Sequence, residues 1–185
     1  MGVALADKAA EYGAIVDLVL GPVNITPQNS SINIINVTTA QSMAEECISR
    51  FPSCDIAILA AAVADYSPAE FSDVKLKKDS ADLFLKLKTT TDIALTLGQS
   101  KKPSQILAGF ALETDNELDN AKRKLISKNL DIIILNSLRE EGAGFGYDTN
   151  KITIIDRNNI IDKFELKSKE DSSADILEKI ISLIR

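Results

Sequence analysis

Short apolar runs alternate along this chain with longer segments in which apolar residues recur at helical spacing. The runs predict core β-strands over residues 14–20, 32–37, 55–59, 105–110 and 131–136. The spacing between and around them predicts helices over residues 3–12, 38–50, 92–97 and 114–129, and a last helix from residue 172. Strands joined by crossovers of this length predict a doubly wound, mostly parallel, Rossmann-like α/β sheet.

Capping signals define where the predicted helices begin. The Thr/Ser-x-x-Gln/Glu/Asp pattern recurs from Thr38, Thr114 and Ser172, and each is expected to start a helix. Thr91 is expected to cap the short helix over 92–97, which Gly98 then ends.

Two pairs of alternating segments predict β-hairpin additions. Residues 72–77 and 83–88 flank a polar turn and predict a hairpin that protrudes from the sheet, and residues 151–155 and 160–166 predict a second hairpin at a sheet edge. The chain has no internal repeat and no linker, so residues 1–185 are expected to form one domain. Because the pattern opens on a helix with no strand before it, an amino-terminally truncated α/β domain is expected.

Composition excludes several kinds of chemistry. The 185 residues contain no histidine and no tryptophan, and the formal net charge is −6. Catalytic schemes that depend on histidine are therefore excluded, and a general nucleic-acid binder is disfavoured. No apolar run is long enough for a membrane span and no signal peptide is visible, so a cytoplasmic protein is expected. Cys47 and Cys54 are expected to be buried free thiols rather than a disulfide or a metal pair.

The stretch from Ala60 to Lys78 is the first candidate for ligand binding. Small residues follow a core strand, then Asp65, and about ten residues later a lysine run that begins at Lys75. Ligands of open α/β sheets bind beyond the carboxyl ends of the strands, where small side chains allow close approach to the backbone. The alternative is a buried strand, a turn at Ser67-Pro68 and a solvated lysine run.

Further candidates also have structural alternatives. Lys124 and Lys128 are four residues apart on one helix face, where they could bind phosphates or form an ordinary solvated flank. Phe110 ends a core strand and could stack on a base or belong to the core. The sequence has no glycine fingerprint for dinucleotides and no Walker loop. The Tyr147-x-x-x-Lys151 match to short-chain dehydrogenases falls in a predicted loop and is interpreted as chance.

Six ordered motifs together resemble one family, the bacterial phosphopantothenate–cysteine ligases (phosphopantothenoylcysteine synthetases). The family is the carboxy-terminal half of a bifunctional coenzyme A biosynthesis protein in most bacteria. The motifs are Ala-Ala-Val-Ala-Asp-Tyr (61–66), Lys-Leu-Lys-Lys (75–78), Thr-Asp-Ile (91–93), Gly-Phe-Ala-x-Glu-Thr (109–114), Lys-Asn-Leu-Asp (128–131) and Phe-Gly-x-Asp-x-Asn (145–150). The resemblance covers nearly the whole chain.

The resemblance implies a two-step, CTP-dependent amide synthesis from 4′-phosphopantothenate and cysteine, through an acyl-cytidylate and with Mg²⁺. It implies Lys75 as the catalytic lysine. The nucleotide-binding residues that it implies are Leu59, Ala60, Ala61, Asp65, Lys75, Thr91, Asp92, Ile93, Ala94, Phe110, Lys124 and Lys128. The metal ligands stay unknown. A homodimer, with residues 83–87 as a possible interface, and a fused or associated flavin-dependent decarboxylase are the implied protein partners.

One departure from the family pattern limits this interpretation. The family begins with a strand and a glycine-rich loop before the segment that matches Met1-Gly2, and part of the acyl-binding pocket lies there. Two alternatives therefore stay open: an NAD(P)-dependent reductase of Rossmann fold, and a non-catalytic nucleotide-binding fragment.

Overall fold

A mixed β-sheet forms the centre of the molecule. The computed structural model of the chain describes residues 1–70, 73–74, 84–113, 115–137 and 147–184. Among these residues, five strands make the main sheet in the order β10 (Ile161–Lys163), β9 (Ile152–Asp156), β7 (Ile132–Ser137), β6 (Ile106–Glu113) and β3 (Ile56–Leu59). β3, β6 and β7 are parallel, whereas β9 is antiparallel to both β7 and β10. The predicted α/β fold and the predicted edge hairpin β9–β10 are confirmed.

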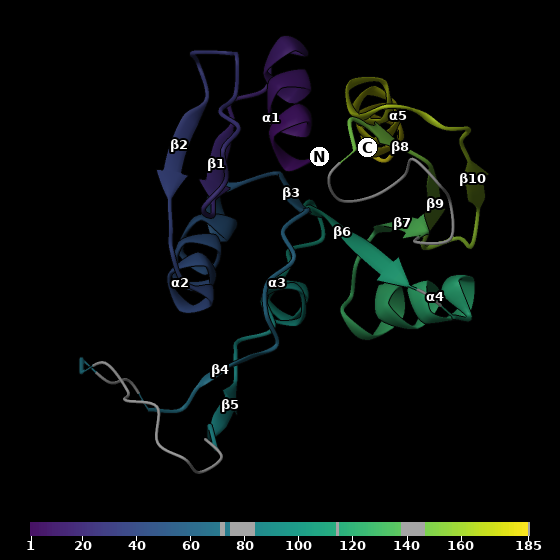
Figure 1. Ribbon diagram of the computed structural model, residues 1–185. Helices are drawn as coiled ribbons and strands as arrows, with labels where there is room; N and C mark the ends of the chain where they lie inside the picture. The colour runs from purple at the N-terminus through teal and green to yellow at the C-terminus, as the bar shows by residue number, and fades with distance from the viewer. Residues whose placement is uncertain (71–72, 75–83, 114, 138–146, 185) are drawn as a thin grey trace.

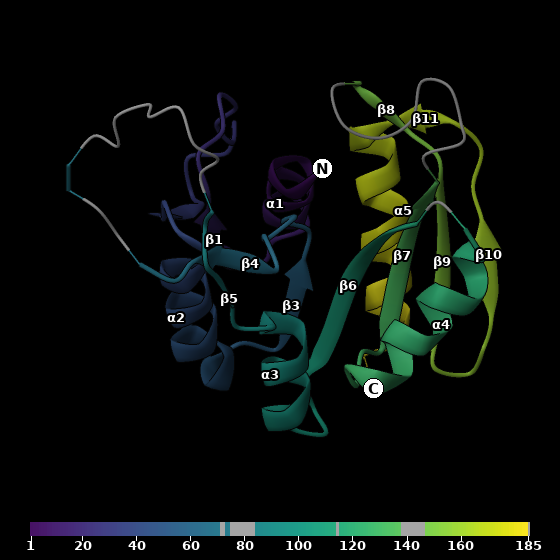
Figure 2. The same cartoon turned by 60° about the horizontal axis from the view of Figure 1, so that its bottom comes forward.

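Helices cover both faces of this sheet, as Figures 1 and 2 show. α1 (Gly2–Glu11) packs against α5 (Lys169–Ser182) on one face, and α3 (Ile93–Ser100) and α4 (Glu117–Ser127) lie on the other. Alternation along β6 divides the core accordingly. Leu107 and Ala111 belong to the cluster with α3 and α4, and Ala108 belongs to the cluster with α1 and α5.

Two shorter strand pairs lie beside the main sheet. β1 (Asp17–Leu20) and β2 (Asn33–Asn36) form a parallel pair, and α2 (Ala40–Arg50) follows with a 3₁₀ turn over Phe51–Ser53. β8 (Thr149–Asn150) pairs with β11 (Lys167–Ser168), directly before α5. The residues of β1, β2 and β3 are only half-buried or exposed, whereas most residues of β6 and β7 are buried.

The predicted protruding hairpin has different strands from those expected. β4 (Tyr66–Pro68) pairs with β5 (Leu87–Thr89), and Figure 1 shows this pair extending away from the body of the molecule. Residues 84–86 and 73–74 are not in strands, so the predicted strands over 72–77 and 83–88 are wrong at these positions, whereas Leu87 and Lys88 lie in β5 as predicted. The remaining positions, 72 and 75–83, lie outside the described residues. The turn at Ser67-Pro68 that the alternative interpretation expects does not form, because both residues lie in β4.

The predicted caps of α2, α4 and α5 are wrong: the cap residue lies one residue later for α2, two residues later for α4, at Asn116, and four residues earlier for α5. α2 is capped by Thr39, whose hydroxyl accepts a hydrogen bond from the Ser42 amide while Ser42 Oγ accepts one from the Thr39 amide. The box is therefore shifted from Thr38. α5 begins at Lys169 because Ser168 caps it, and Ser172 is fully buried inside the helix.

The two cysteines are free and half-buried. Burial raises the pKa of both thiols, so neither is a reactive thiolate at neutral pH. Across the described part of the chain, no helix combines the length and apolar character that a membrane crossing requires.

Candidate nucleotide-binding site

Two lysines, Lys124 of α4 and Lys128 directly after it, are each held by a carboxylate from another element. Lys124 Nζ lies 2.6 Å from Oε1 of Glu113, which is the last residue of β6. Lys128, which follows α4, extends to Asp92, with Nζ 2.9 Å from one carboxylate oxygen and 3.1 Å from the other. The shared helix face that the spacing predicted therefore carries two ion pairs, one to the end of β6 and one to the start of α3.

Glu113 is fixed from both of its oxygens. Asn120, one turn before Lys124 on α4, donates from Nδ2 to Glu113 Oε2 at 3.1 Å, and Arg123 donates to Asn120 Oδ1. The Glu113 side chain is only 13% exposed. Burial opposes its ionisation, but the hydrogen bonds from Lys124 and Asn120 outweigh it and hold the pKa of Glu113 below its ordinary value. Glu113 is therefore a fixed carboxylate at neutral pH.

A solvent-open cavity of about 550 Å³ lies over this network. Its lining consists of Glu113, Asn120, Arg123, Lys124, Ile126 and Ser127. Two cations and one carboxylate thus face the same space, next to the apolar side chain of Ile126, which is 79% exposed. Such a cavity can accept an anionic ligand.

Asp92, not Thr91, caps α3. Its Oδ1 accepts a hydrogen bond from the Leu95 amide at 3.0 Å, so the predicted cap is wrong by one residue. Burial alone would raise the pKa of Asp92, but the hydrogen bonds from the Leu95 amide and from Lys128 outweigh burial, so the pKa lies below its ordinary value. Thr91 is exposed, Ile93 is buried in the core, and Ala94 packs against the same cluster.

Gly98 brings α3 and the end of α4 into direct contact. A Cβ built on Gly98 would lie 2.0 Å from the carbonyl oxygen of Lys128. Asn129 donates from Nδ2 to the Gly98 carbonyl at 2.6 Å. The helix continues past Gly98 to Ser100, so the prediction that this glycine ends α3 is wrong. Its role is close packing, which sets where Lys128 lies relative to Asp92.

The predicted strand-end segment lies beside the approach to α3. The Thr90 amide donates to the Asp65 carbonyl at 2.9 Å, and the Thr90 hydroxyl donates to the Ala64 carbonyl at 2.6 Å. Asp65 itself is exposed, and Leu59, at the end of β3, pairs with Gly109 of β6. The structure thus brings residues 59–65 and 90–94 together.

Ala60 and Phe110 belong to the other face of the sheet. Both are half-buried and pack against the cluster formed with α1 and α5, whereas the lysines come from the α4 side. Ala61 is exposed directly after Ala60. The expected nucleotide-binding residues therefore surround the ends of β3 and β6 from both faces rather than from one. Lys75 lies outside the described residues.

Sequence reasoning missed Glu113, Asn120 and Arg123 as site residues. Glu113 is part of the Gly-Phe-Ala-x-Glu-Thr motif, but the sequence does not show that its ion-pair partner is Lys124. Asn120 is four residues before Lys124, so helical spacing places both on one face.

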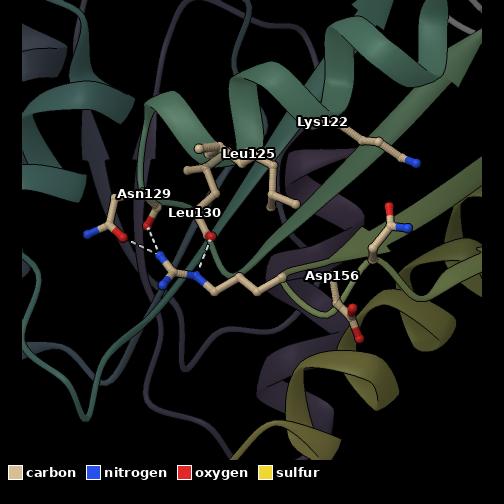
Figure 3. Close-up of a pocket in the computed structure, with 8 residues that line it drawn as sticks. Lys122, Leu125, Asn129, Leu130 and Asp156 are labelled. Atoms are coloured by element: carbon tan, nitrogen blue, oxygen red, sulfur yellow. Dashed lines mark hydrogen bonds between the residues drawn. The ribbon is translucent and has the colours of Figure 1, made fainter.

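A second cavity, of about 360 Å³, lies between α4 and the β9–β10 turn. Figure 3 shows Leu125 and Leu130 lining it, with the Lys122 ammonium group pointing away from them. The guanidinium of Arg157 is occupied there by backbone, because Nε donates to the Leu130 carbonyl at 2.6 Å and Nη2 to the Asn129 carbonyl at 2.7 Å. We assign this cavity a structural role, since its cation fastens the end of α4 to β9.

The class of the protein follows from these features: it is an α/β domain of Rossmann-like fold, with lysines and carboxylates collected where α3, α4 and β6 meet. Residues 1–184 match the DNA/pantothenate metabolism flavoprotein C-terminal domain family, and the chain belongs to that family.

Named relatives support this assignment. The chain is 42% identical over 183 residues to the coenzyme A biosynthesis bifunctional protein CoaBC of Bacillus subtilis (strain 168), which is 99% of this chain and 45% of that protein. It is 56% identical over 184 residues to a cysteine/cysteine sulfinic acid decarboxylase of an unknown prokaryotic organism, which is 100% of this chain and 51% of that protein. The chain thus spans about half the length of these two relatives.

The crystal structure of the C-terminal domain of a coenzyme A biosynthesis bifunctional protein CoaBC superposes with a TM-score of 0.81. The sequence identity is 32%, and the match covers 97% of this chain and 79% of that one.

Proposed function

We propose that this chain is the ligase domain of a coenzyme A biosynthesis protein and that it joins 4′-phosphopantothenate to cysteine with CTP as the activating nucleotide. The observation that carries the proposal is that Lys124, on α4, is held by Glu113 beside an open cavity, while Lys128, directly after α4, is held by Asp92. Family membership supports it, because relatives named for coenzyme A biosynthesis match nearly the whole chain.

The chemistry fits a site without histidine. In the first step the pantothenate carboxylate attacks the α-phosphate of CTP, which forms an acyl-cytidylate and releases pyrophosphate. In the second, the cysteine amine attacks the acyl carbon and CMP leaves. Both steps need charge stabilisation and positioning more than a strong base. Lys124 and Lys128 supply cations for the phosphates, and Lys75 is proposed to act on the acyl-cytidylate.

The backbone groups that we propose for nucleotide binding are those at the start of α3 and after β3. The amides of the first turn of α3 lie beside Asp92 and carry the positive end of the helix dipole. Small side chains at Ala60 and Ala61 allow a nucleotide to approach the backbone after β3. Phe110, half-buried next to this segment, is proposed to contact the nucleotide.

Mg²⁺ is proposed to arrive with the triphosphate. Among the described residues, no group of three or more histidine, cysteine, aspartate or glutamate side chains is placed to hold a metal ion. Mg²⁺ is commonly held by one or two carboxylates together with substrate phosphates. Asp92 and Glu113 are carboxylates of this kind, and both are ionised at neutral pH. The ion would neutralise charge on the β- and γ-phosphates.

Protein partners follow from the length of the relatives. CoaBC is named as a bifunctional protein and this chain matches 45% of it, so we propose a fused or associated flavin-dependent decarboxylase as the partner. We also propose a homodimer. Exposed apolar side chains on the protruding β4–β5 segment, among them Phe84 at 89% exposed and Leu87, are candidates for its interface.

The deciding experiment measures pyrophosphate release with CTP, phosphopantothenate and cysteine. It is run on this chain and on a version extended upstream, because the relatives are about twice as long. We expect release that depends on both CTP and phosphopantothenate. Absence of release from the extended version would refute the ligase proposal. A parallel measurement of CO₂ release from cysteine and cysteine sulfinic acid tests the activity for which the 56%-identical relative is named.

A further inference from the structure

The phosphate-binding lysines of the proposed site are already neutralised by carboxylates. Lys124 lies 2.6 Å from Glu113, and Lys128 lies 2.9 Å from Asp92. A phosphate oxygen that takes the position of either carboxylate must break an existing ion pair. The charge available to an incoming anion is therefore smaller than two lysines suggest.

Glu113 is the better placed of the two carboxylates to compete with a ligand. It lines the same cavity as Lys124 and Arg123. Asn120 donates a hydrogen bond to its Oε2, which opposes rotation of Glu113 away from Lys124 when an anion enters. A fixed carboxylate beside a bound phosphate also repels it directly, since the two groups would share one ammonium partner.

We propose that Glu113 acts as an internal counter-ion that competes with phosphate for Lys124 and so limits the affinity of the site for phosphate anions. Asp92 does the same for Lys128. The inference rests on the proposed function, in which these lysines bind phosphates. Its consequence for a ligase is that pyrophosphate, the product of the first step, is held weakly and leaves.

The test is pyrophosphate binding by isothermal titration calorimetry at low ionic strength, without divalent cations. Glu113→Gln keeps the shape of the side chain and its acceptor oxygen but removes the charge. We expect it to bind pyrophosphate about three- to tenfold more tightly than the unmodified chain. Asp92→Asn, which keeps a good helix cap, is expected to tighten binding in the same direction.

A matched control separates this local effect from a change in net charge. Asp119→Asn removes one negative charge from the same helix, but Asp119 is exposed and lies five residues before Lys124, about 140° away around the helix. We expect its affinity for pyrophosphate to stay unchanged. Equal tightening in the Asp119 variant would mean that net charge alone is responsible and would overturn the proposal.

The Lys124→Met variant distinguishes failure of the counter-ion proposal from failure of the proposed phosphate site. Weaker pyrophosphate binding by Lys124→Met, together with unchanged or weaker binding by Glu113→Gln, would refute the counter-ion role and leave the phosphate site standing. Unchanged binding by Lys124→Met would instead refute the phosphate site itself. In the double variant, the tightening by Glu113→Gln is expected to shrink, because the shared ammonium group is gone. Thermal unfolding of each variant checks that the fold is kept.

Discussion

Replacing Gly98 by alanine tests the packing that places the two helices of the site. A Cβ at this position would lie 2.0 Å from the Lys128 carbonyl oxygen, where ordinary contact begins at 3.4 Å. The helices must therefore separate locally by about 1.4 Å. The contact is with backbone and no side chain can rotate to relieve it, so the strain falls on the hydrogen bond from Asn129 to the Gly98 carbonyl.

The expected cost follows from two opposing effects. Overpacking of this kind destabilises by about 1–3 kcal/mol, and alanine in a helix gains about 1 kcal/mol over glycine. Because the new Cβ would clash with backbone, we expect the upper end of the overpacking cost and a net loss of about 2 kcal/mol, which corresponds to a fall of roughly 4–8 °C in Tm for a domain of this size. Pyrophosphate binding is expected to change as well, because Lys128 moves relative to Asp92.

Urea unfolding and calorimetric binding measure the two effects separately. Gly2→Ala is the matched control, since Gly2 also lies in a helix but its nearest neighbour, Ala60 Cβ, would be 3.6 Å from the new Cβ. That variant is expected to be at least as stable as the unmodified chain. If Gly98→Ala were equally stable and bound pyrophosphate with unchanged affinity, the close contact between α3 and Lys128 would be refuted.

Four further outcomes are expected. Lys75→Gln should leave CTP affinity largely intact but stop product formation. Normal turnover by this variant would refute the catalytic role proposed for Lys75. Lys124→Ala should weaken CTP binding about fivefold at low salt, with a smaller effect at high salt, and unchanged affinity at low salt would count against a phosphate contact. The folded protein lowers the pKa values of Glu113 and Asp92 from 4.5 and 3.8, so their ionisation stabilises the fold above these values and this stabilisation is lost as pH falls below them. The difference in Tm between the unmodified chain and Glu113→Gln should therefore shrink between pH 6 and pH 3. A difference in Tm that stays constant over this range would contradict the stabilising role of the Glu113 carboxylate. Asp131→Asn should lower the free energy of unfolding by about 1–3 kcal/mol in urea titrations, because its carboxylate accepts the Leu107 amide at 2.7 Å and pairs with two cations; a loss below 0.5 kcal/mol would disprove this.

The order of strands and helices could be predicted from the sequence because hydrophobic periodicity reports burial directly. β6 and β7 read as continuous apolar runs, since parallel strands are buried on both faces. Membership of the family could likewise be recognised from six ordered motifs, and the profile match over residues 1–184 confirms it.

Helix starts were harder to predict because the local signals are degenerate. Ser168 and Ser172 each precede an aspartate by three residues, so both fit one capping pattern. Contacts outside the helix decide between them: β11 pairs with β8, and the Lys169 amide donates to the Asp148 carbonyl at 2.9 Å. These contacts fix the chain immediately before α5, and Ser168 becomes the cap.

The contacts of the candidate site likewise depend on packing that local sequence patterns do not show. Glycine often follows a helix end, so the sequence predicts that Gly98 ends α3, but the residue is needed for contact with Lys128, thirty residues later in the chain. The pairing of Lys124 with Glu113 similarly depends on how α4 lies against the end of β6. Sequence spacing could place the lysines on one face, but only the packing of three elements could show which carboxylates hold them.

The most direct test of the proposed function follows the amide bond itself. Isotopically labelled cysteine is incubated with phosphopantothenate and the upstream-extended protein, with CTP, with ATP or without nucleotide, and the products are identified by mass spectrometry. We expect phosphopantothenoylcysteine carrying the label with CTP, together with CMP, and none without nucleotide. Labelled product without nucleotide, or no labelled product with either nucleotide, would contradict the assignment of this chain as a nucleotide-dependent ligase domain.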